Sequence, residues 1–131
     1  MQLSALAGIV FALAAAGVVA FQVALALGAP WGAYAMGGAV DGRFPPALRI
    51  AAVLQAGVIA VIALGVLSVA GVVVQGFGTA FPWFAWVAVA MSGLAVVLNS
   101  ISRSAGERRI WVPISIVLLA SSLVVALDVR I

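Results

Sequence analysis

The chain has 131 residues, of which 67% are hydrophobic and 7% are charged, and its formal net charge is +3. A soluble domain carries about 25% charged residues because its surface faces water, so this composition excludes an ordinary soluble protein. Cysteine, histidine and lysine are all absent, which excludes disulfides, thiol nucleophiles, ordinary zinc sites and lysine-based covalent chemistry. The sequence therefore predicts an integral membrane protein with no catalytic residue, metal or cofactor.

The first apolar stretch covers residues 3–27 and predicts a membrane-spanning helix. It ends at Gly28-Ala29-Pro30, a typical helix stop. A run of about 25 residues is longer than the apolar core of a signal peptide, so we expect a retained span. The loop that follows extends to Pro46 and contains Trp31 and Tyr34. Because Trp and Tyr favour the headgroup layer, we expect this loop to lie along the membrane surface.

Three further spans are predicted at residues 47–74, 83–101 and 110–128. An uncharged segment at residues 75–82 separates the second span from the third. In the last gap, Ser104 and Glu107 have the spacing of a capping box, which predicts that a helix begins near Ala105. Pro113 falls in the third turn of that helix. The sequence thus predicts a single domain, residues 1–131, with four transmembrane helices.

The positive charges predict how these helices are oriented. Five of the six basic residues lie in or beside the first and third gaps, and the second gap has none. Short loops rich in arginine remain in the cytoplasm, so both termini are expected on the extracytoplasmic side of an antiparallel four-helix bundle. This role accounts for the positive charge without a nucleic-acid partner; the arginines are Arg43, Arg49, Arg103, Arg108 and Arg109.

Three amide side chains, those of Gln22, Gln55 and Asn99, lie within the spans near the arginine-bearing face. At a rise of 1.5 Å per residue, all three are within roughly 15 Å of that face. They predict a polar, cytoplasm-facing pocket for a small amphiphile or lipid. The alternative is that each amide makes an interhelical hydrogen bond. The predicted ligand-binding residues are Gln22, Trp31, Tyr34, Arg43, Arg49, Gln55, Asn99, Arg103 and Glu107.

The first span carries a small residue at every fourth position. Such a ridge lets a second helix backbone approach closely, which favours helix association in lipid. The ridge indicates either packing within the chain or an interface with a second copy or a larger membrane complex. Its residues are Gly8, Ala12, Ala16, Ala20 and Ala24, with Ser4 and Gly28 at its ends.

The third gap is the densest polar segment, and two interpretations remain open. It is either a solvated loop with a weak pair between Glu107 and an arginine, or an anion site at a helix N-terminus. No pair of carboxylates, no serine beside a base and no phosphate-binding glycine loop occurs anywhere in the sequence.

The motifs of the first and third loops resemble those of a group of small bacterial four-span membrane proteins. The first carries Gly28-Ala29-Pro30-Trp31-Gly32, Ala35-Met36-Gly37-Gly38 and Phe44-Pro45-Pro46-Ala47-Leu48-Arg49. The third carries Asn99-Ser100-Ile101-Ser102-Arg103-Ser104 with Glu107-Arg108 and Pro113. The sequence departs from that group at Trp31, where a branched aliphatic residue is common, and near Asp41, where a histidine is common. The resemblance implies a bacterial cytoplasmic membrane protein and implies no activity.

Two functional hypotheses follow. The first is a non-enzymatic membrane protein that binds or moves a small amphiphile or lipid through the polar pocket. The second is an accessory or scaffolding subunit, or a homo-oligomer, assembled through the small-residue ridge. An integral membrane enzyme is the least favoured because the usual catalytic side chains are missing.

Overall fold

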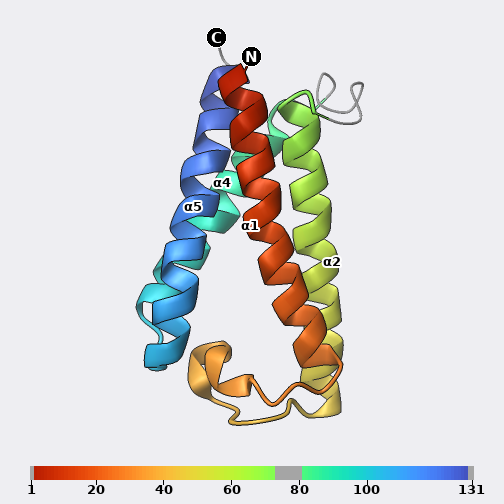
Figure 1. Cartoon of the computed structure of the whole chain (residues 1–131), viewed down its shortest axis with the longest axis vertical. Helices are drawn as coiled ribbons and strands as arrows, with labels where there is room; N and C mark the ends of the chain where they lie inside the picture. The colour runs from red at the N-terminus through yellow and green to blue at the C-terminus, as the bar shows by residue number, and fades with distance from the viewer. Residues whose placement is uncertain (1, 73–80, 130–131) are drawn as a thin grey trace.

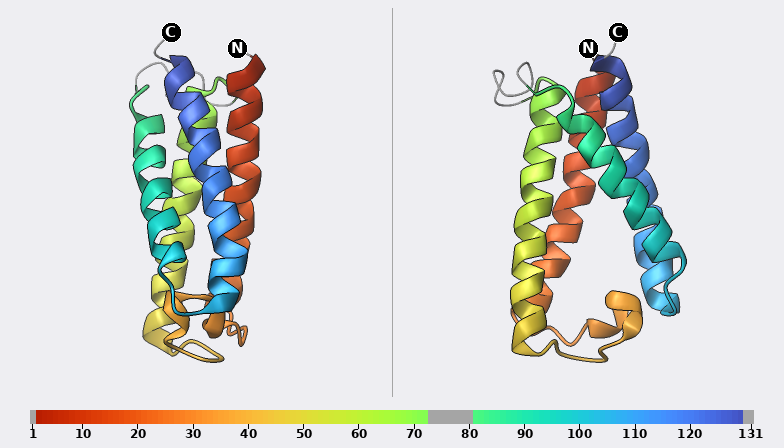
Figure 2. Two further views of the ribbon diagram at one scale, coloured as in Figure 1. Left: turned by 90° about the vertical axis from the view of Figure 1, so that its left-hand side faces the viewer. Right: turned by 180° about the vertical axis from the view of Figure 1, so that it is seen from behind.

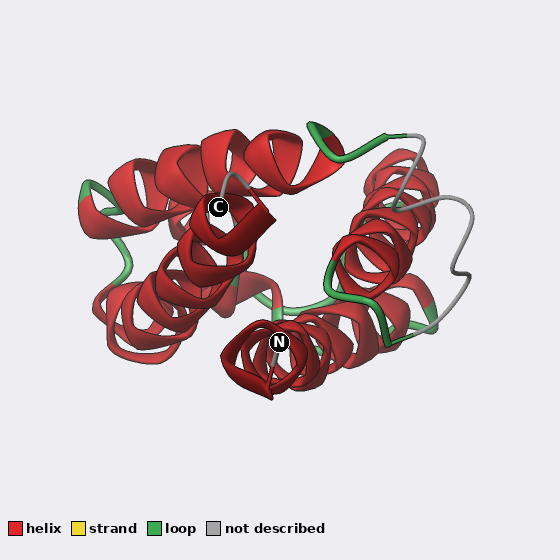
Figure 3. Cartoon of the chain, turned by 90° about the horizontal axis from the view of Figure 1, so that it is seen from above, coloured by secondary structure: helices red, strands yellow, loops and turns green. Residues whose placement is uncertain are grey.

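Each of the four apolar stretches forms one helix in the computed structural model, which describes residues 2–72 and 81–129. No strand occurs among these residues, and helices make up nearly all of their regular structure (Figure 3). The uncharged segment at residues 75–82 lies mostly outside the described residues. The helices are α1 (Gln2–Ala26), α2 (Pro46–Val69), α4 (Phe84–Ser100) and α5 (Ala105–Val129), and two short 3₁₀ turns, η1 (Gly32–Tyr34) and η2 (Met36–Gly38), lie in the first loop.

Glycines end the first two helices in the same way. Gly28 and Gly71 have φ of 99° and 82°, the left-handed conformation that follows a helix end in a Schellman motif. In α2, the amide of Val72 donates to the carbonyl of Leu67 at 2.9 Å and that of Gly71 to Ser68 at 3.0 Å. The predicted stop at Gly28 is confirmed. The second helix, by contrast, ends at Val69 and not near residue 74 as predicted, because Gly71 turns the chain.

Helix α5 begins at Ala105, as the capping pattern predicts. The Ser104 hydroxyl accepts a hydrogen bond from the Glu107 amide at 3.1 Å, which satisfies one of the free donors at the helix start. The other half of the capping box is not formed. The Ser104 amide donates to the Ser102 hydroxyl at 3.1 Å, and the Glu107 carboxylate binds a different loop.

Three of the helices, α1, α2 and α5, are long and apolar enough to cross a membrane. The remaining helix, α4, is also apolar but has 17 residues, which is the minimum length for a span. Large apolar side chains such as Leu13 and Leu64 are exposed along the helices. A surface of this kind is suited to contact with lipid.

The helices form two pairs that are close together at one end of the molecule and apart at the other. Helix α1 packs on α2, α4 packs on α5, and α1 also packs on α5. Figures 1 and 2 show the pairs converging where α1 begins and α5 ends, and separating toward the first loop. We call these the terminal end and the loop end.

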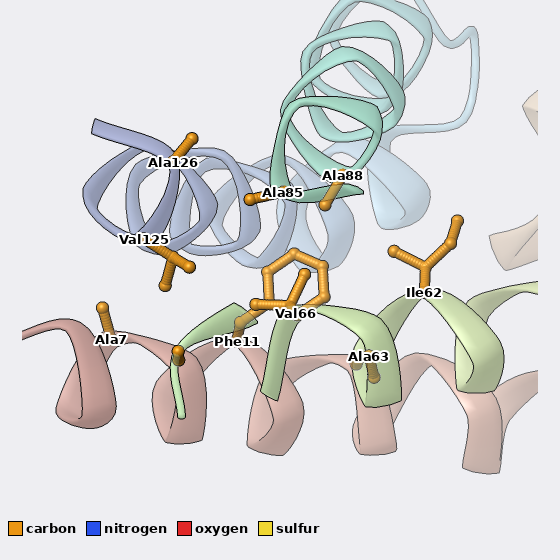
Figure 4. Packing of buried hydrophobic residues seen from close by; sticks show 11 residues of the cluster. Ala7, Phe11, Ile62, Ala63, Val66, Ala85, Ala88, Val125 and Ala126 are labelled. Atoms are coloured by element: carbon orange, nitrogen blue, oxygen red, sulfur yellow. The ribbon is translucent and has the colours of Figure 1, made fainter. Parts of the chain in front are cut away.

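The terminal end is packed with small side chains. Eleven buried residues form its core, and seven of them are alanine. Figure 4 shows side chains from α1, α2, α4 and α5 meeting there around Phe11 and Val66. A Cβ on Gly8 would lie 2.7 Å from the Cβ of Ala70, so α1 and α2 are as close as glycine permits. The packing of small residues thus brings the helix backbones together, as in other membrane helix pairs.

At the loop end, the first loop crosses from the α1–α2 pair to the start of α5 (Figure 2). It is folded on itself, since the amide of Gly32 donates to the carbonyl of Gly42 at 2.8 Å. A Cβ on Gly32 would lie 2.2 Å from the Val40 carbonyl oxygen, so no larger residue fits this turn. Beneath the loop, a second buried cluster is formed by Leu25, Ala35, Phe44 and Ala52.

Candidate functional site: a cavity between the two helix pairs

A cavity of about 550 Å³ occupies the space between the two helix pairs. Its upper wall is the core of the terminal end, with Phe11, Ile62 and Ala88. Its floor at the loop end is the first loop, which contributes Tyr34–Gly37 and Phe44. The volume lies within the range of about 300–1,000 Å³ that is usual for sites binding small molecules.

Most of the cavity wall is apolar, and all four helices contribute to it. The polar groups are few, and they lie on all four helices and in the floor. The apolar lining includes Phe11, Val18, Phe21, Leu48, Ile59, Ile62, Met91, Leu98, Trp111, Ile114 and Leu118, and the polar side chains are Gln22, Tyr34, Gln55, Ser92, Asn99, Glu107 and Ser115. An apolar space with a few polar groups is the usual character of a site for a small apolar or amphiphilic molecule.

The three amides singled out from the sequence all line this cavity. Gln22 and Asn99 are half-buried, and Gln55 is exposed. Gln55 lies nine residues after the start of α2, so it is about 14 Å along the helix from the loop end. Within the described residues, none of the three side chains makes a hydrogen bond. The interhelical hydrogen bonds considered as the alternative are therefore not formed there, and the amide groups are free to bind a ligand.

Three long-range hydrogen bonds attach the floor to α5 and its N-cap. The Gly37 amide donates to Oε1 of Glu107 at 3.0 Å, and Glu107 is only 7% exposed. The Ser104 hydroxyl donates to the Ala33 carbonyl at 2.6 Å, and the Trp111 indole donates to the Tyr34 carbonyl at 2.9 Å. These bonds join residues 70 or more positions apart and hold the first loop against the third loop and the start of α5. We call the three hydrogen bonds and the segments that they join the latch.

The latch explains the roles of two predicted site residues. Glu107 lines the cavity, but its carboxylate is committed to the Gly37 amide. The Tyr34 ring packs on Gly106, where a Cβ would lie 2.5 Å from its Cε1. Both residues therefore serve first to hold the floor in place.

The predicted arginines lie outside the cavity. Nε of Arg49 donates to the Phe44 carbonyl at 2.9 Å, and the guanidinium group lies against Gly28. Arg103 lines a separate hollow between the first and third loops, and Arg43 is exposed on the first loop. None of the described residues that line the cavity is a cation.

The remaining predicted residue, Trp31, also lies outside the cavity and is exposed. Its ring stacks on Phe21, with 6.3 Å between ring centroids and 5° between planes. Phe21 in turn packs on Trp111 at 4.6 Å. Trp31 thus packs on Phe21, a residue that lines the cavity, without lining the cavity itself.

Sequence reasoning did not find several lining residues, among them Phe21, Met91, Ser92, Trp111 and Ser115. Most are apolar, and in a sequence with this composition an apolar residue facing a cavity has the same signature as one facing lipid. The buried serines offered a weak signal. However, the Ser115 hydroxyl donates to the carbonyls of Trp111 and Val112 within its own helix, so it is already paired.

The exposed lining residues show where the cavity opens. They lie on α2, on or next to α4, and in the first loop, and they are Gln55, Met91, Leu98, Ile101, Tyr34 and Met36. The corresponding residues of α1 and α5 are half-buried or buried. The exposed part of the lining therefore lies on the side of α2, α4 and the first loop and not on that of α1 and α5.

The small-residue ridge of α1 is divided between two environments. Gly8 packs on α2, Ala12 and Ala24 are half-buried, and Ala16 and Ala20 are exposed. An α-helix has 3.6 residues per turn, so residues spaced four apart do not stay on one face. Only part of the ridge therefore faces the other helices of the chain.

No protein-family model, no curated protein and no solved structure matches this chain. Among the described residues, no group of acidic side chains could hold a metal ion.

Proposed function

We propose that this protein is a small, non-enzymatic integral membrane protein that binds or moves a small amphiphile or lipid. The observation that carries this proposal is the cavity of about 550 Å³, with apolar walls and three unpaired amides. Apolar walls suit the chain of an amphiphile, and the amides suit its polar head. We place the entry from the bilayer between α2 and α4, where Gln55, Met91 and Leu98 line the cavity and are exposed.

The orientation that we propose follows from the charges. Arg43, Arg49, Arg103, Arg108 and Arg109 all belong to segments at the loop end. Positively charged segments next to spans remain in the cytoplasm, so the loop end faces the cytoplasm and both termini lie outside. The protein then crosses the bacterial cytoplasmic membrane four times as an antiparallel bundle. Helix α4, with 17 residues, has the minimum length for crossing this membrane.

Cysteine labelling tests this orientation, because the natural chain has no cysteine to interfere. We expect Ser100→Cys, an exposed position at the loop end, to resist a membrane-impermeant maleimide in intact cells and to react after permeabilisation. A cysteine added before Met1 should react in intact cells. The opposite pattern, or labelling of both positions from outside, would refute the proposed orientation.

The cavity is tested by filling it. Ala95 lines the cavity, and Ala90, on the same helix, is exposed and does not line it. We expect Ala95→Trp to abolish labelling of the protein by a photoactivatable monoacylglycerol in lipid nanodiscs, because the indole occupies the ligand's space. Ala90→Trp, which places the same ring on the outer face, should label like the natural protein.

Two results would contradict the binding function. One is the absence of labelled peptides from the cavity wall of the natural protein with every photoactivatable amphiphile, whether its head is uncharged, anionic or cationic. The other is equal labelling of the Ala95→Trp and Ala90→Trp variants, since binding would then not use the cavity. Circular dichroism of both variants before the assay establishes that each retains its helices.

A further inference from the structure

The charges around the cavity restrict the kind of ligand that it accepts. Glu107 is the only carboxylate among the described lining residues, and no arginine lines the cavity. An ionised headgroup that is removed from water needs a partner of opposite charge, because an unpaired charge in an apolar space is very unfavourable. An anionic head would have no such partner here and would lie in the same cavity as the Glu107 carboxylate.

The cations of the first and third loops do not line the cavity; Arg103 lines the separate hollow, and two others bind backbone carbonyls. Arg49 donates to the Phe44 carbonyl, and Nη1 of Arg108 donates to the Ser102 carbonyl. At the N-terminus of α5, a possible anion site, one amide is already paired, since the Ser104 hydroxyl accepts the Glu107 amide. An anion in the cavity would therefore find no positively charged donor among the described residues that line it.

A cationic head is not favoured either. The only opposite charge is Glu107, whose Oε1 accepts the Gly37 amide and helps to hold the floor. An ammonium group that paired with this carboxylate would compete with the latch. The amides of Gln22, Gln55 and Asn99, in contrast, each offer free donors and an acceptor at no such cost.

We infer that the ligand is an uncharged, single-chain amphiphile whose head bears hydroxyl or amide groups. This inference rests on the proposed binding function and specifies its ligand class. The amides bind the head, and the apolar space toward Phe11 and Ile62 takes the chain. A cavity of about 550 Å³ suits one chain better than the two chains of a diacyl phospholipid.

The test compares three photoactivatable probes of equal chain length in nanodiscs at neutral pH. They are a monoacylglycerol, a fatty acid and an alkylamine, with uncharged, anionic and cationic heads. We expect the monoacylglycerol to label the cavity wall at a concentration at least about tenfold lower than either charged probe, given the cost of an unpaired buried charge. Labelled peptides are identified by mass spectrometry.

A matched pair of variants tests the electrostatic cause. Gln55→Arg places a cation in the cavity, and Ser100→Arg places one at the loop end outside it. Gln55→Arg should strengthen labelling by the fatty acid about tenfold, as expected when a buried anion gains a partner. Ser100→Arg should leave the order of the three probes unchanged.

The possible failures are distinguishable. If the fatty acid or the alkylamine labels the natural cavity as well as the monoacylglycerol does, the inferred ligand class is wrong and the binding function stands. If Ser100→Arg strengthens fatty-acid labelling as much as Gln55→Arg does, the selectivity comes from the membrane surface and the inference also fails. If no probe labels the cavity wall, the proposed function itself fails.

Discussion

The terminal end and the loop end of this molecule are built from the same four helices but are held together differently. At the terminal end, alanine and glycine let the helix backbones meet directly. At the loop end, the rings of Phe21 on α1 and Trp111 on α5 meet between the pairs, and the latch joins the first loop to α5. In lipid, where apolar side chains gain little by leaving their solvent, close packing decides which helices touch. The comparison shows how one end becomes a core and the other a cavity.

The largest expected effect is on the terminal end. Ala85 is 0% exposed in the core of this end, so Ala85→Leu forces the helices apart. We expect a loss of about 3 kcal/mol in the free energy of unfolding, the upper part of the usual range for overpacking. Unfolding by dodecyl sulfate in mixed micelles measures this loss.

The control is Ala90→Leu, which adds the same atoms to the exposed face of α4. It should leave the free energy of unfolding nearly unchanged. Equal losses in the two variants would mean that direct packing of small residues does not hold the terminal end together.

A smaller effect is expected when the latch is broken. Glu107→Leu removes the acceptor of the Gly37 amide, and a hydrogen bond to a charged group contributes about 1.5–3 kcal/mol. We expect faster hydrogen exchange in the first loop and unchanged exchange in the second half of α2, because the two ends are held independently. Exchange measured by mass spectrometry in nanodiscs tests this.

Glu107→Gln is the matched variant, since its amide oxygen can still accept the hydrogen bond. Exchange in the first loop should rise less than in Glu107→Leu. If Glu107→Leu instead accelerates exchange equally at both ends, the latch and the core are one cooperative unit, and the distinction between the ends is wrong.

The smallest effect is expected on the outer part of the small-residue ridge. Ala16 is exposed, whereas its neighbour Ala15 is 1% exposed. We expect Ala16→Leu to change the free energy of unfolding by less than about 0.5 kcal/mol, while Ala15→Leu lowers it by about 1–3 kcal/mol.

The same variant tests assembly through the ridge. If Ala16→Leu lowers the mass of the native assembly in mild detergent, the exposed part of the ridge is an interface. An accessory or oligomeric role would then be favoured over a protein that acts alone.

Much of the fold could be predicted because it depends on local features. Apolar stretches predicted four helices, Gly28 predicted the end of α1, and Ser104 predicted the start of α5. The end of α2 could not be predicted in the same way, because Gly71, with its left-handed conformation, lies within a continuous apolar run. Hydropathy alone does not mark such a stop.

The candidate site was predictable only in part. Polar residues within an apolar chain stand out, so Gln22, Gln55 and Asn99 were identified, and all three line the cavity. The arginines of the same loops were grouped with them, but they bind backbone carbonyls or face other surfaces. Proximity to one end of the molecule does not determine the direction in which a long side chain extends.

The sequence by itself determined the helices, their apolar character and the grouping of the arginines, because these depend on composition and on order along the chain. Only the tertiary structure decided that the helix pairs separate, that the first loop is attached to α5, and that the amides face a common space without cations. Those features arise from contacts between residues far apart along the chain, and the shapes of the packed side chains select them.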